Sequence, residues 1–142
     1  MAKSMKFVIT GGAGFIGSNI AKLLVKNGHN VIILDNFKTG KKENLELIKD
    51  KVELYNLDIR NKKAIKKIIG NSDGIFHQAA LANVYESFSK SEEYFDVNVN
   101  GTKNIFEIAE ENQIKVVFAS SSSVYGDVPY VPIKENFGRN PI

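Results

Sequence analysis

The sequence contains no cysteine and no long apolar run, and both absences exclude classes of protein. Without thiols the chain can form neither a disulfide framework nor a thiolate metal centre, and we expect no metal site. The lysine-bearing N-terminus leads into only Phe7–Thr10 before glycines follow. That stretch is too short for a signal peptide or a membrane span. We therefore expect a cytoplasmic protein with no membrane partner.

A strong charge of one sign is also absent. Nineteen basic side chains against sixteen acidic ones give a net charge of +3. The lysines are spread along the chain and form no arginine-rich or aromatic-interleaved patch, so nucleic acid is not an expected partner. The composition, 43% hydrophobic and 25% charged, is typical of a globular protein, and 142 residues fit one domain.

What the sequence does contain is an alternation of short apolar runs with longer stretches of helical period. This pattern is typical of repeated βαβ units on a parallel sheet. The expected strands are Phe7–Thr10, Val31–Leu34, Val52–Tyr55, Gly74–His77 and Val116–Ala119. The second and fifth runs are continuously apolar, so we expect helices on both faces of these strands. The sequence predicts an α/β fold with a Rossmann-like, doubly wound parallel sheet of five strands in the order 3-2-1-4-5.

Helical periodicity fills the intervals between these strands. The first helix is expected over Phe15–Asn27, and its apolar stripe consists of Ile16, Ile20, Leu23 and Leu24. Further helices are expected over Glu43–Lys49, Lys62–Ile69 and Glu92–Glu111. All three prolines lie between Gly126 and Ile142, so we expect an extended loop there.

Glycines at G-x-x-G-x-x-G spacing, from Gly11 to Gly17, stand between the first expected strand and the first helix. In a dinucleotide site the first glycine permits a tight turn, and the second lets backbone N–H groups approach the pyrophosphate. The third lets the helix pack closely on the strand, and the helix N-terminus favours the anion. We expect this turn to bind a dinucleotide pyrophosphate, although the same glycines could form ordinary turns without a ligand.

Asp35 ends the second expected strand, 18 residues after Gly17. A carboxylate there can accept hydrogen bonds from the adenosine ribose hydroxyls of a dinucleotide. Its charge would repel the 2′-phosphate of NADP, so NAD is the expected cofactor. Lys38, Lys41 and Lys42 follow closely and could soften that repulsion.

Further motifs accompany the glycine turn along the chain. They are Leu34-Asp35-Asn36, Asp58-Ile59-Arg60, His77-Gln78-Ala79-Ala80, Asn98-Val99-Asn100-Gly101-Thr102 and Ser120-Ser121-Ser122-Ser123-Val124-Tyr125-Gly126. In this order they resemble the extended short-chain dehydrogenases/reductases of the NAD-dependent epimerase/dehydratase family. Within that family the chain is most similar to the UDP-glucose 4-epimerase group.

The resemblance implies a role for each matching residue. The pyrophosphate turn would comprise Gly11, Gly14, Phe15, Ile16 and Gly17. The other cofactor contacts would be Asp35 and Asn36 on the adenosine ribose, Asp58 and Ile59 on the adenine, and Ala79 and Ala80 along the cleft. Ser121 is the candidate catalytic residue, because it matches the family hydroxyl that hydrogen-bonds the reacting group of a nucleotide-sugar substrate.

Several of these residues also have structural interpretations. Asp58 could end the third strand as a turn former. His77 continues an apolar run and is better explained as a partly buried structural histidine than as a catalytic base. Gly101 would permit close packing or a kink within the long helix. The serines around Ser121 could form a loop, but they follow the fifth strand at the sheet edge where open α/β folds bind ligands.

The resemblance also implies a catalytic tyrosine and lysine spaced Y-x-x-x-K on a helix. The literal match from Tyr130 to Lys134 contains Pro132, which disfavours helical geometry at Val131. It also begins only nine residues after Ser121, which is too early for the family pair. We therefore expect the chain to stop before that pair, the sixth strand and the C-terminal domain, and to lack most turnover on its own.

The leading hypothesis is an incomplete NAD-binding domain over residues 1–142, from a 4-epimerase that oxidises C4 of UDP-glucose or UDP-galactose transiently. One alternative is a self-standing NAD-binding module or pseudoenzyme. Another is a nucleotide-sugar dehydratase or reductase, although dehydratases usually carry a threonine and acidic residues around the position of Ser121. With no strand beyond it, Val116–Ala119 would expose an apolar edge, so self-association or a homo-oligomer is expected.

Overall fold

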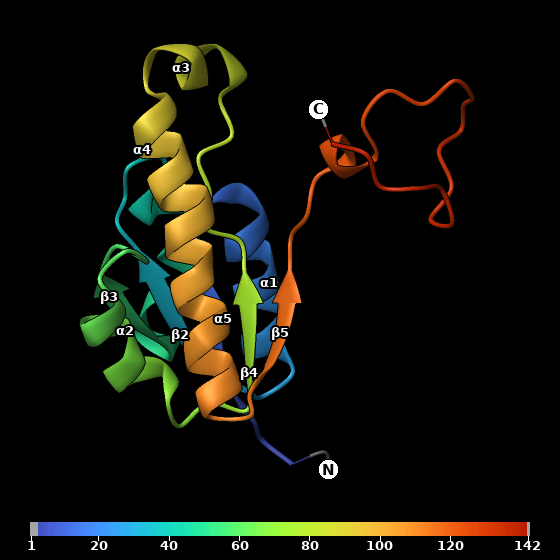
Figure 1. The fold of residues 1–142 in the computed structure, drawn as a ribbon. Coiled ribbons are helices and arrows are strands. Elements are labelled where there is room, and N and C mark those ends of the chain that lie inside the picture. The colour runs from blue at the N-terminus through green and yellow to red at the C-terminus, as the bar shows by residue number, and fades with distance from the viewer. Residues whose placement is uncertain (1–2, 142) are drawn as a thin grey trace.

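The computed structural model describes residues 3–141, which form an all-parallel sheet between two layers of helices (Figure 1). The strands are β1 (Lys6–Thr10), β2 (Asn30–Asp35), β3 (Val52–Asn56), β4 (Gly74–His77) and β5 (Lys115–Phe118). Their order is β3-β2-β1-β4-β5, which confirms the predicted topology. The connection reverses direction between β1 and β4, and ligands bind at such a switch point in doubly wound folds.

The helical segments divide between the two faces of the sheet. They are α1 (Phe15–Lys26), η1 (Lys42–Lys51), α2 (Lys62–Ile69), α3 (Val84–Ser89), α4 (Ser91–Phe95), η2 (Asp96–Gly101), α5 (Thr102–Glu111) and η3 (Ser122–Tyr125). One core cluster joins α1 and η1 to one face, and the other joins α2 and α5 to the opposite face.

Successive side chains of the central strands point to opposite faces of the sheet, which explains the two clusters. Val8 and Ile32 pack toward α2 and α5, whereas their chain neighbours Ile9 and Ile33 pack toward α1. All four side chains are at most 1% exposed. Because β2 is covered on both faces, its apolar run is continuous, as the sequence predicted.

The face that α1 turns to the sheet differs from the predicted stripe. Gly17, Ser18 and Ala21 are buried, whereas Ile16 and Leu23 are each 60% exposed. Small residues let the helix approach the sheet closely, so they define the contact face even though larger apolar residues lie beside it. Of the predicted stripe, Ile20 and Leu24 pack against the core, whereas its other two residues do not.

The helix predicted over Glu92–Glu111 is interrupted rather than uniform. α4 passes into the π-helical segment η2, which continues into α5. The segment predicted as a helix over Glu43–Lys49 is the 3-10 helix η1, whereas α2 has the predicted bounds. The short helix α3 was not predicted. It is capped by Asn83, whose side-chain oxygen accepts a hydrogen bond of 3.1 Å from the Glu86 N–H.

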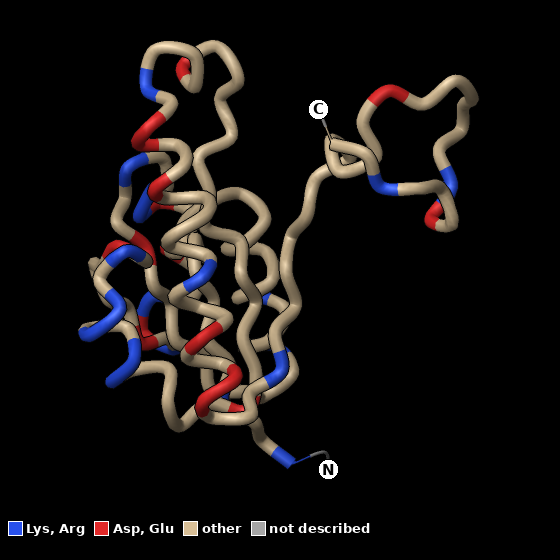
Figure 2. Tube along the Cα trace, viewed as in Figure 1, with Lys and Arg blue, Asp and Glu red and all other residues tan. Residues whose placement is uncertain are grey.

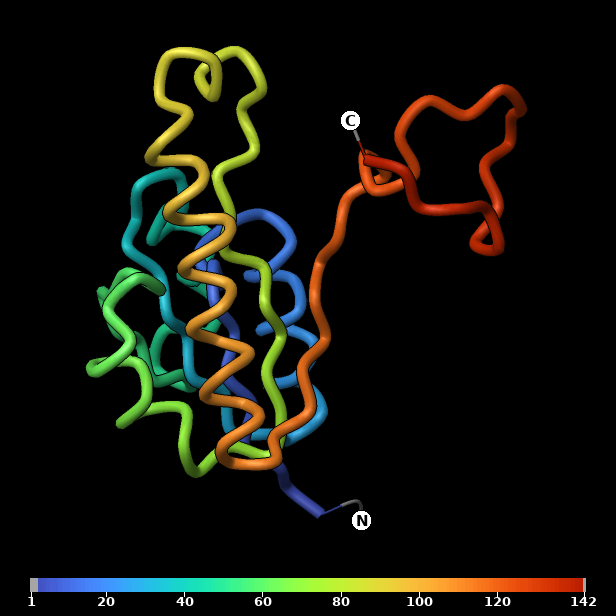
Figure 3. The backbone as a smooth tube through the Cα atoms, in the orientation of Figure 1, coloured from blue at the N-terminus to red at the C-terminus, as the bar shows by residue number. Residues whose placement is uncertain are grey.

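β5 is an edge strand with exposed side chains. It hydrogen-bonds only to β4 within the described sheet, and Val117 and Phe118 are 55% and 46% exposed. α5 covers one face of this strand, where Val116 packs against the core and Phe106 meets Phe118. The prediction of helices on both faces is therefore wrong for the face that carries Val117. Residues 119–141 leave the sheet as an arm that contains only η3 (Figure 3). The extended loop predicted beyond Gly126 is confirmed for the described residues.

Charged residues of both signs lie along the helices (Figure 2). Lys62 pairs with Glu107 at 2.7 Å and Lys66 pairs with Glu111 at 2.6 Å, so ion pairs link α2 to α5. No helix among residues 3–141 is long and apolar enough to cross a membrane.

Candidate functional site

A pocket that is open to solvent, with about 550 Å³ of empty space, lies at the carboxyl edge of the sheet. Its walls come from the loops that follow β1, β2, β3 and β4, together with one side chain of η2. The predicted cofactor residues that line it are Gly11, Gly14, Asp35, Asn36, Asp58, Ile59, Ala79 and Ala80. The fold thus gathers at one place residues that are separated by up to 69 positions in the chain.

The glycine turn is shaped by close backbone contacts. Gly11 has a φ of +66°, and a Cβ on it would lie 2.7 Å from the Ala79 nitrogen. A Cβ on Gly17 would lie 2.3 Å from the Gly11 oxygen, so only glycine allows α1 to sit this close to the turn. Gly17 therefore acts through packing and does not line the pocket.

The N-terminus of α1 faces the pocket without a side-chain cap. Gly14 is the N-cap and lines the pocket, and it offers no side chain to the first turn. The first N–H groups of a helix have no intrahelical partners, so they remain free to bind an anion. The side chains of Phe15 and Ile16 are 82% and 60% exposed and do not line the pocket. Only their backbone N–H groups could contact a pyrophosphate.

Asp35 is 7% exposed and joins the glycine turn to the loop after β2. Its Oδ2 accepts a hydrogen bond of 2.9 Å from the Ala13 N–H, and its Oδ1 accepts one of 2.8 Å from the Phe37 N–H. A carboxylate oxygen has two lone pairs, so each oxygen keeps one for a ribose hydroxyl. The carboxylate also requires Gly40 beside it, because a Cβ there would lie 2.7 Å from Oδ1. No pattern in the sequence indicates this bracing role of Gly40.

Asp58 lines the pocket and is held by Arg60 in a bidentate pair. Arg60 Nε donates to Oδ1 at 2.9 Å and Nη2 donates to Oδ2 at 2.8 Å. The Arg60 N–H and Asn36 Nδ2 each donate a further bond of 2.9 Å. The guanidinium, more than any other neighbour, holds the pKa of Asp58 well below its usual range despite partial burial. Asp58 therefore both forms the turn after β3 and lines the pocket.

Two asparagines outside the pocket hold its loops in place. Asn98 accepts a hydrogen bond of 2.8 Å from the Leu81 N–H and donates one of 2.9 Å to the Leu81 carbonyl. Asn104 Nδ2 donates to the carbonyl of Ile59 at 3.1 Å. Sequence analysis assigned neither role. The Asn98–Thr102 motif contains only the first of these asparagines, and spacing alone does not reveal which loop an asparagine holds.

His77 is 1% exposed and lies between two hydroxyl groups. Its Nδ1 is 2.6 Å from Thr10 Oγ1, and its Nε2 is 2.9 Å from Thr102 Oγ1. Burial lowers the pKa of His77 to about 4, so the ring is neutral at pH 7. It also stacks on Phe118 at a centroid distance of 5.5 Å. The structural interpretation of this histidine is therefore the one that its contacts support.

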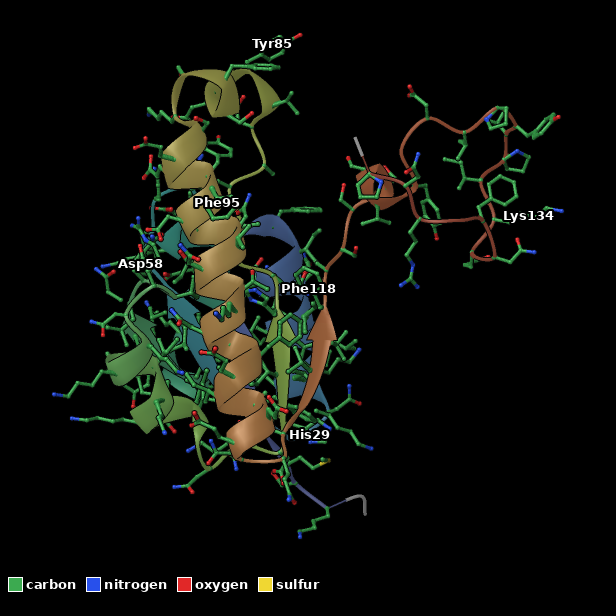
Figure 4. All side chains as sticks on the ribbon, viewed as in Figure 1. His29, Asp58, Tyr85, Phe95, Phe118 and Lys134 are labelled. Carbon is green, nitrogen blue, oxygen red and sulfur yellow. The ribbon has the colours of Figure 1, made fainter. Side chains whose placement is uncertain are left out.

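The structure does not bring Ser121 into the pocket. Ser121 is exposed and caps η3, where its Oγ accepts a hydrogen bond of 3.2 Å from the Ser123 N–H. Tyr130 and Lys134 lie further along the arm, outside any helix, as predicted for this literal Y-x-x-x-K match. Figure 4 places Lys134 on the arm, whereas Asp58 lies on the body of the molecule. The role of Ser121 stays a prediction.

Comparison with known proteins agrees with this geometry. The sequence pattern of the NAD dependent epimerase/dehydratase family matches residues 7–142. A putative UDP-glucose 4-epimerase of Methanocaldococcus jannaschii is 46% identical over 138 residues, which cover 95% of this chain and 44% of that protein. A UDP-N-acetyl-alpha-D-glucosaminuronate decarboxylase of Bacillus cytotoxicus is 42% identical over 119 residues, which cover 84% of this chain and 37% of that protein. The chain thus spans less than half the length of these relatives.

Solved structures show the same arrangement. A UDP-N-acetylglucosamine 4-epimerase from Methanobrevibacter ruminantium superposes with a TM-score of 0.90 at 37% identity, covering 99% of this chain and 45% of that one. The UDP-glucose 4-epimerase of Thermus thermophilus, in complex with NAD, gives a TM-score of 0.86 at 35% identity, covering 96% and 45% respectively. The chain belongs to the NAD dependent epimerase/dehydratase family, in which it aligns with the NAD-binding portion of UDP-sugar 4-epimerases.

Proposed function

We propose that this chain is the NAD-binding portion of a nucleotide-sugar 4-epimerase of the UDP-glucose/UDP-galactose type. The observation that carries the proposal is the pocket at the switch point of the sheet, in which the glycine turn faces Asp35 and the loops after β3 and β4. A relative that is 46% identical carries the name of this activity.

The residues present fit a bound NAD. The uncapped first turn of α1 would hold the pyrophosphate, and Asp35 would accept hydrogen bonds from the adenosine ribose. Asp58 and Ile59 would border the adenine, and Ala79 and Ala80 leave room along the other end of the pocket. Bound NAD would supply a transient acceptor for the hydride that leaves C4 of the sugar. Ser121 would orient the reacting hydroxyl, which requires that the arm come toward the pocket.

The activity of the full-length protein, its nucleotide-sugar substrate and its assembly belong to the same proposal. Self-association through the exposed edge of β5 and a cytoplasmic location are part of it.

A second candidate is another NAD-dependent reaction on a nucleotide sugar, because a decarboxylase is 42% identical over 119 residues. The cofactor pocket is common to both candidates. Assay of the complete gene product with UDP-glucose and with a UDP-hexuronate would distinguish them.

Calorimetric titration of the chain with NAD tests the cofactor role directly. We expect saturable binding, and we expect Asp35→Ala to weaken it about tenfold to a hundredfold, because hydrogen bonds to a charged group are lost. Asp127→Ala is the matched control, since Asp127 is exposed on the arm away from the pocket. A folded chain that binds no NAD would overturn the proposal, and equal affinity in the Asp35→Ala variant would remove Asp35 from the site.

A further inference from the structure

Lys38 occupies a place in the pocket that matters for the choice between NAD and NADP. It follows Asp35 on the loop after β2 and lines the pocket beside Asn36 and Thr39. Among the residues that line the pocket it is the only lysine or arginine. The two cofactors differ by a phosphate on the adenosine 2′-hydroxyl, which is the group expected next to Asp35. A cation at Lys38 could therefore offset the repulsion between that carboxylate and a 2′-phosphate.

The charge of Lys38 is compensated by a carboxylate on α4, an element far from it in the chain. Its Nζ donates a hydrogen bond to Glu93 Oε1 on α4, and the two side chains are 32% and 33% exposed. Glu86 also lies near Lys38, but its carboxylate pairs with Lys90 and accepts a hydrogen bond of 2.9 Å from the Tyr94 hydroxyl. Glu93 is therefore the carboxylate that binds Lys38.

The other two lysines of this loop do not replace Lys38. Lys42 Nζ lies 5.5 Å from the centroid of the Phe37 ring, over its face. Neither Lys41 nor Lys42 lines the pocket. Asp58 also lines the pocket, but its carboxylate is paired with Arg60. The balance of charge around a 2′-phosphate is thus set by Asp35, Lys38 and the partner of Lys38.

We infer that Glu93 is a specificity-determining residue that disfavours NADP by holding Lys38 in an ion pair. With Lys38 neutralised and drawn toward α4, Asp35 would be the uncompensated charge beside the 2′-hydroxyl of a bound adenosine. The inference rests on the proposed NAD-binding function and adds to it a residue 58 positions from Asp35. Glu93 acts through Lys38, so it is a positioning residue and not a cofactor ligand.

Titration of Glu93→Gln with NAD and NADP tests this inference. Loss of the carboxylate leaves Lys38 free to meet the added phosphate, so we expect NADP to bind about fivefold more tightly while NAD affinity changes less than about twofold. The gain should shrink as ionic strength rises, because the interaction is electrostatic and partly exposed. A merely structural role for Glu93 would change both affinities together.

Matched variants separate the ion pair from general effects of charge. Glu92→Gln removes the same charge from the neighbouring position of α4, where Glu92 forms no ion pair among residues 3–141. Lys38→Met combined with Glu93→Gln should abolish the gain. The fragments 2′,5′-ADP and 5′-AMP, which differ only in the 2′-phosphate, should reproduce the shift in selectivity.

The outcomes are distinguishable. If the wild-type chain binds NAD but Glu93→Gln and Glu92→Gln give the same ratio of NADP to NAD affinity, the inference fails and the proposed function stands. If the gain persists in the double variant, Lys38 is not the intermediary and the inference also fails. If folded wild-type protein binds no adenine nucleotide, both the proposed function and this inference are overturned.

Discussion

His77 illustrates how burial determines the chemistry available to a side chain. Its ring lies between Thr10 and Thr102, and both nitrogens have a hydroxyl partner. Because burial penalises the charged form, the pKa of His77 falls to about 4. An imidazole in this state holds β4 to β1 and α5 and leaves no nitrogen to exchange protons with a substrate.

The depressed pKa of His77 predicts a pH-dependent stability. The unfolded chain binds the proton near pH 6.5 and the folded chain only near pH 4, so stability is complete above pH 6.5 and decreases as the pH falls toward 4. From pH 7 to pH 5 the free energy of unfolding should drop by about 2 kcal/mol. Urea denaturation of the wild type and of His77→Gln measures the drop, which the variant should lack. An equal drop in both proteins would contradict the assignment.

Asp35 and Asp58 show that one carboxylate can serve the fold and the pocket together. Asp35 fixes the glycine turn through the Ala13 N–H, and Asp58 fixes its own loop through Arg60. Arg60 also reaches Asp96, with 3.2 Å between its Nη1 and the carboxylate, and so ties this loop to η2. Pocket residues that are braced in this way lose little conformational entropy when a cofactor binds.

Among the elements, η2 is the segment where the helix becomes π-helical beside the loop that follows β3. Gly101 ends this π-helical turn, and Ile59 packs directly against its backbone. A Cβ on Gly101 would lie 2.6 Å from Ile59 Cδ1. The interruption of the predicted long helix therefore occurs where the loop after β3, which lines the pocket, meets α5.

The contact between Gly101 and Ile59 predicts coupled stabilities. Gly101→Ala gains about 1 kcal/mol of helix propensity but overpacks the contact by about 1–3 kcal/mol, so we expect net destabilisation. Ile59→Val removes the Cδ1 atom at a cost of about 1 kcal/mol. The double variant should lose less stability than the sum of the two single losses, as measured by chemical denaturation.

Gly138→Ala is the control for this cycle, because a Cβ on Gly138 would contact nothing within 4 Å. Its free energy of unfolding should stay close to that of the wild type. Strict additivity of the Gly101 and Ile59 changes would show that the two residues do not interact in the way the structure indicates.

For the molecule as a whole, the exposed edge of β5 is a surface that can pair with another chain. A strand edge offers unpaired N–H and C=O groups to another chain, and here the exposed side chains beside them are apolar. We expect self-association of the chain that increases with concentration. Val117→Lys should raise the monomer fraction, because a charge on an edge strand opposes strand pairing.

Sedimentation velocity over a range of concentrations checks this prediction. Val131→Lys introduces the same charge on the arm, at a residue that is 85% exposed, and should leave the association unchanged. A wild-type chain that remains monomeric at the highest concentration would contradict the proposed role of the β5 edge.

Local patterns in the sequence predicted the elements well. All five strands lie within one residue of their predicted ends, since apolar β-branched runs bounded by glycine or polar residues have few other conformations. The glycine spacing indicated the turn and Asp35 indicated its partner. The contact face of α1 was predicted only in part, because periodicity counts large apolar residues. Ile20 and Leu24 of the predicted stripe pack against the core, but the closest approach to the sheet is made by the small residues Gly17 and Ala21.

The sequence by itself therefore determined the fold class, the strand order and eight of the residues that line the pocket, because these follow from periodicity, turn chemistry and known motifs. Only the tertiary structure decided which side chains meet across the sheet edge. Arg60 with Asp96, Asn98 with Leu81 and Lys38 with Glu93 are contacts of this kind. They join loops and helices far apart in the chain, and no local pattern encodes where such elements converge until the sheet has brought them together.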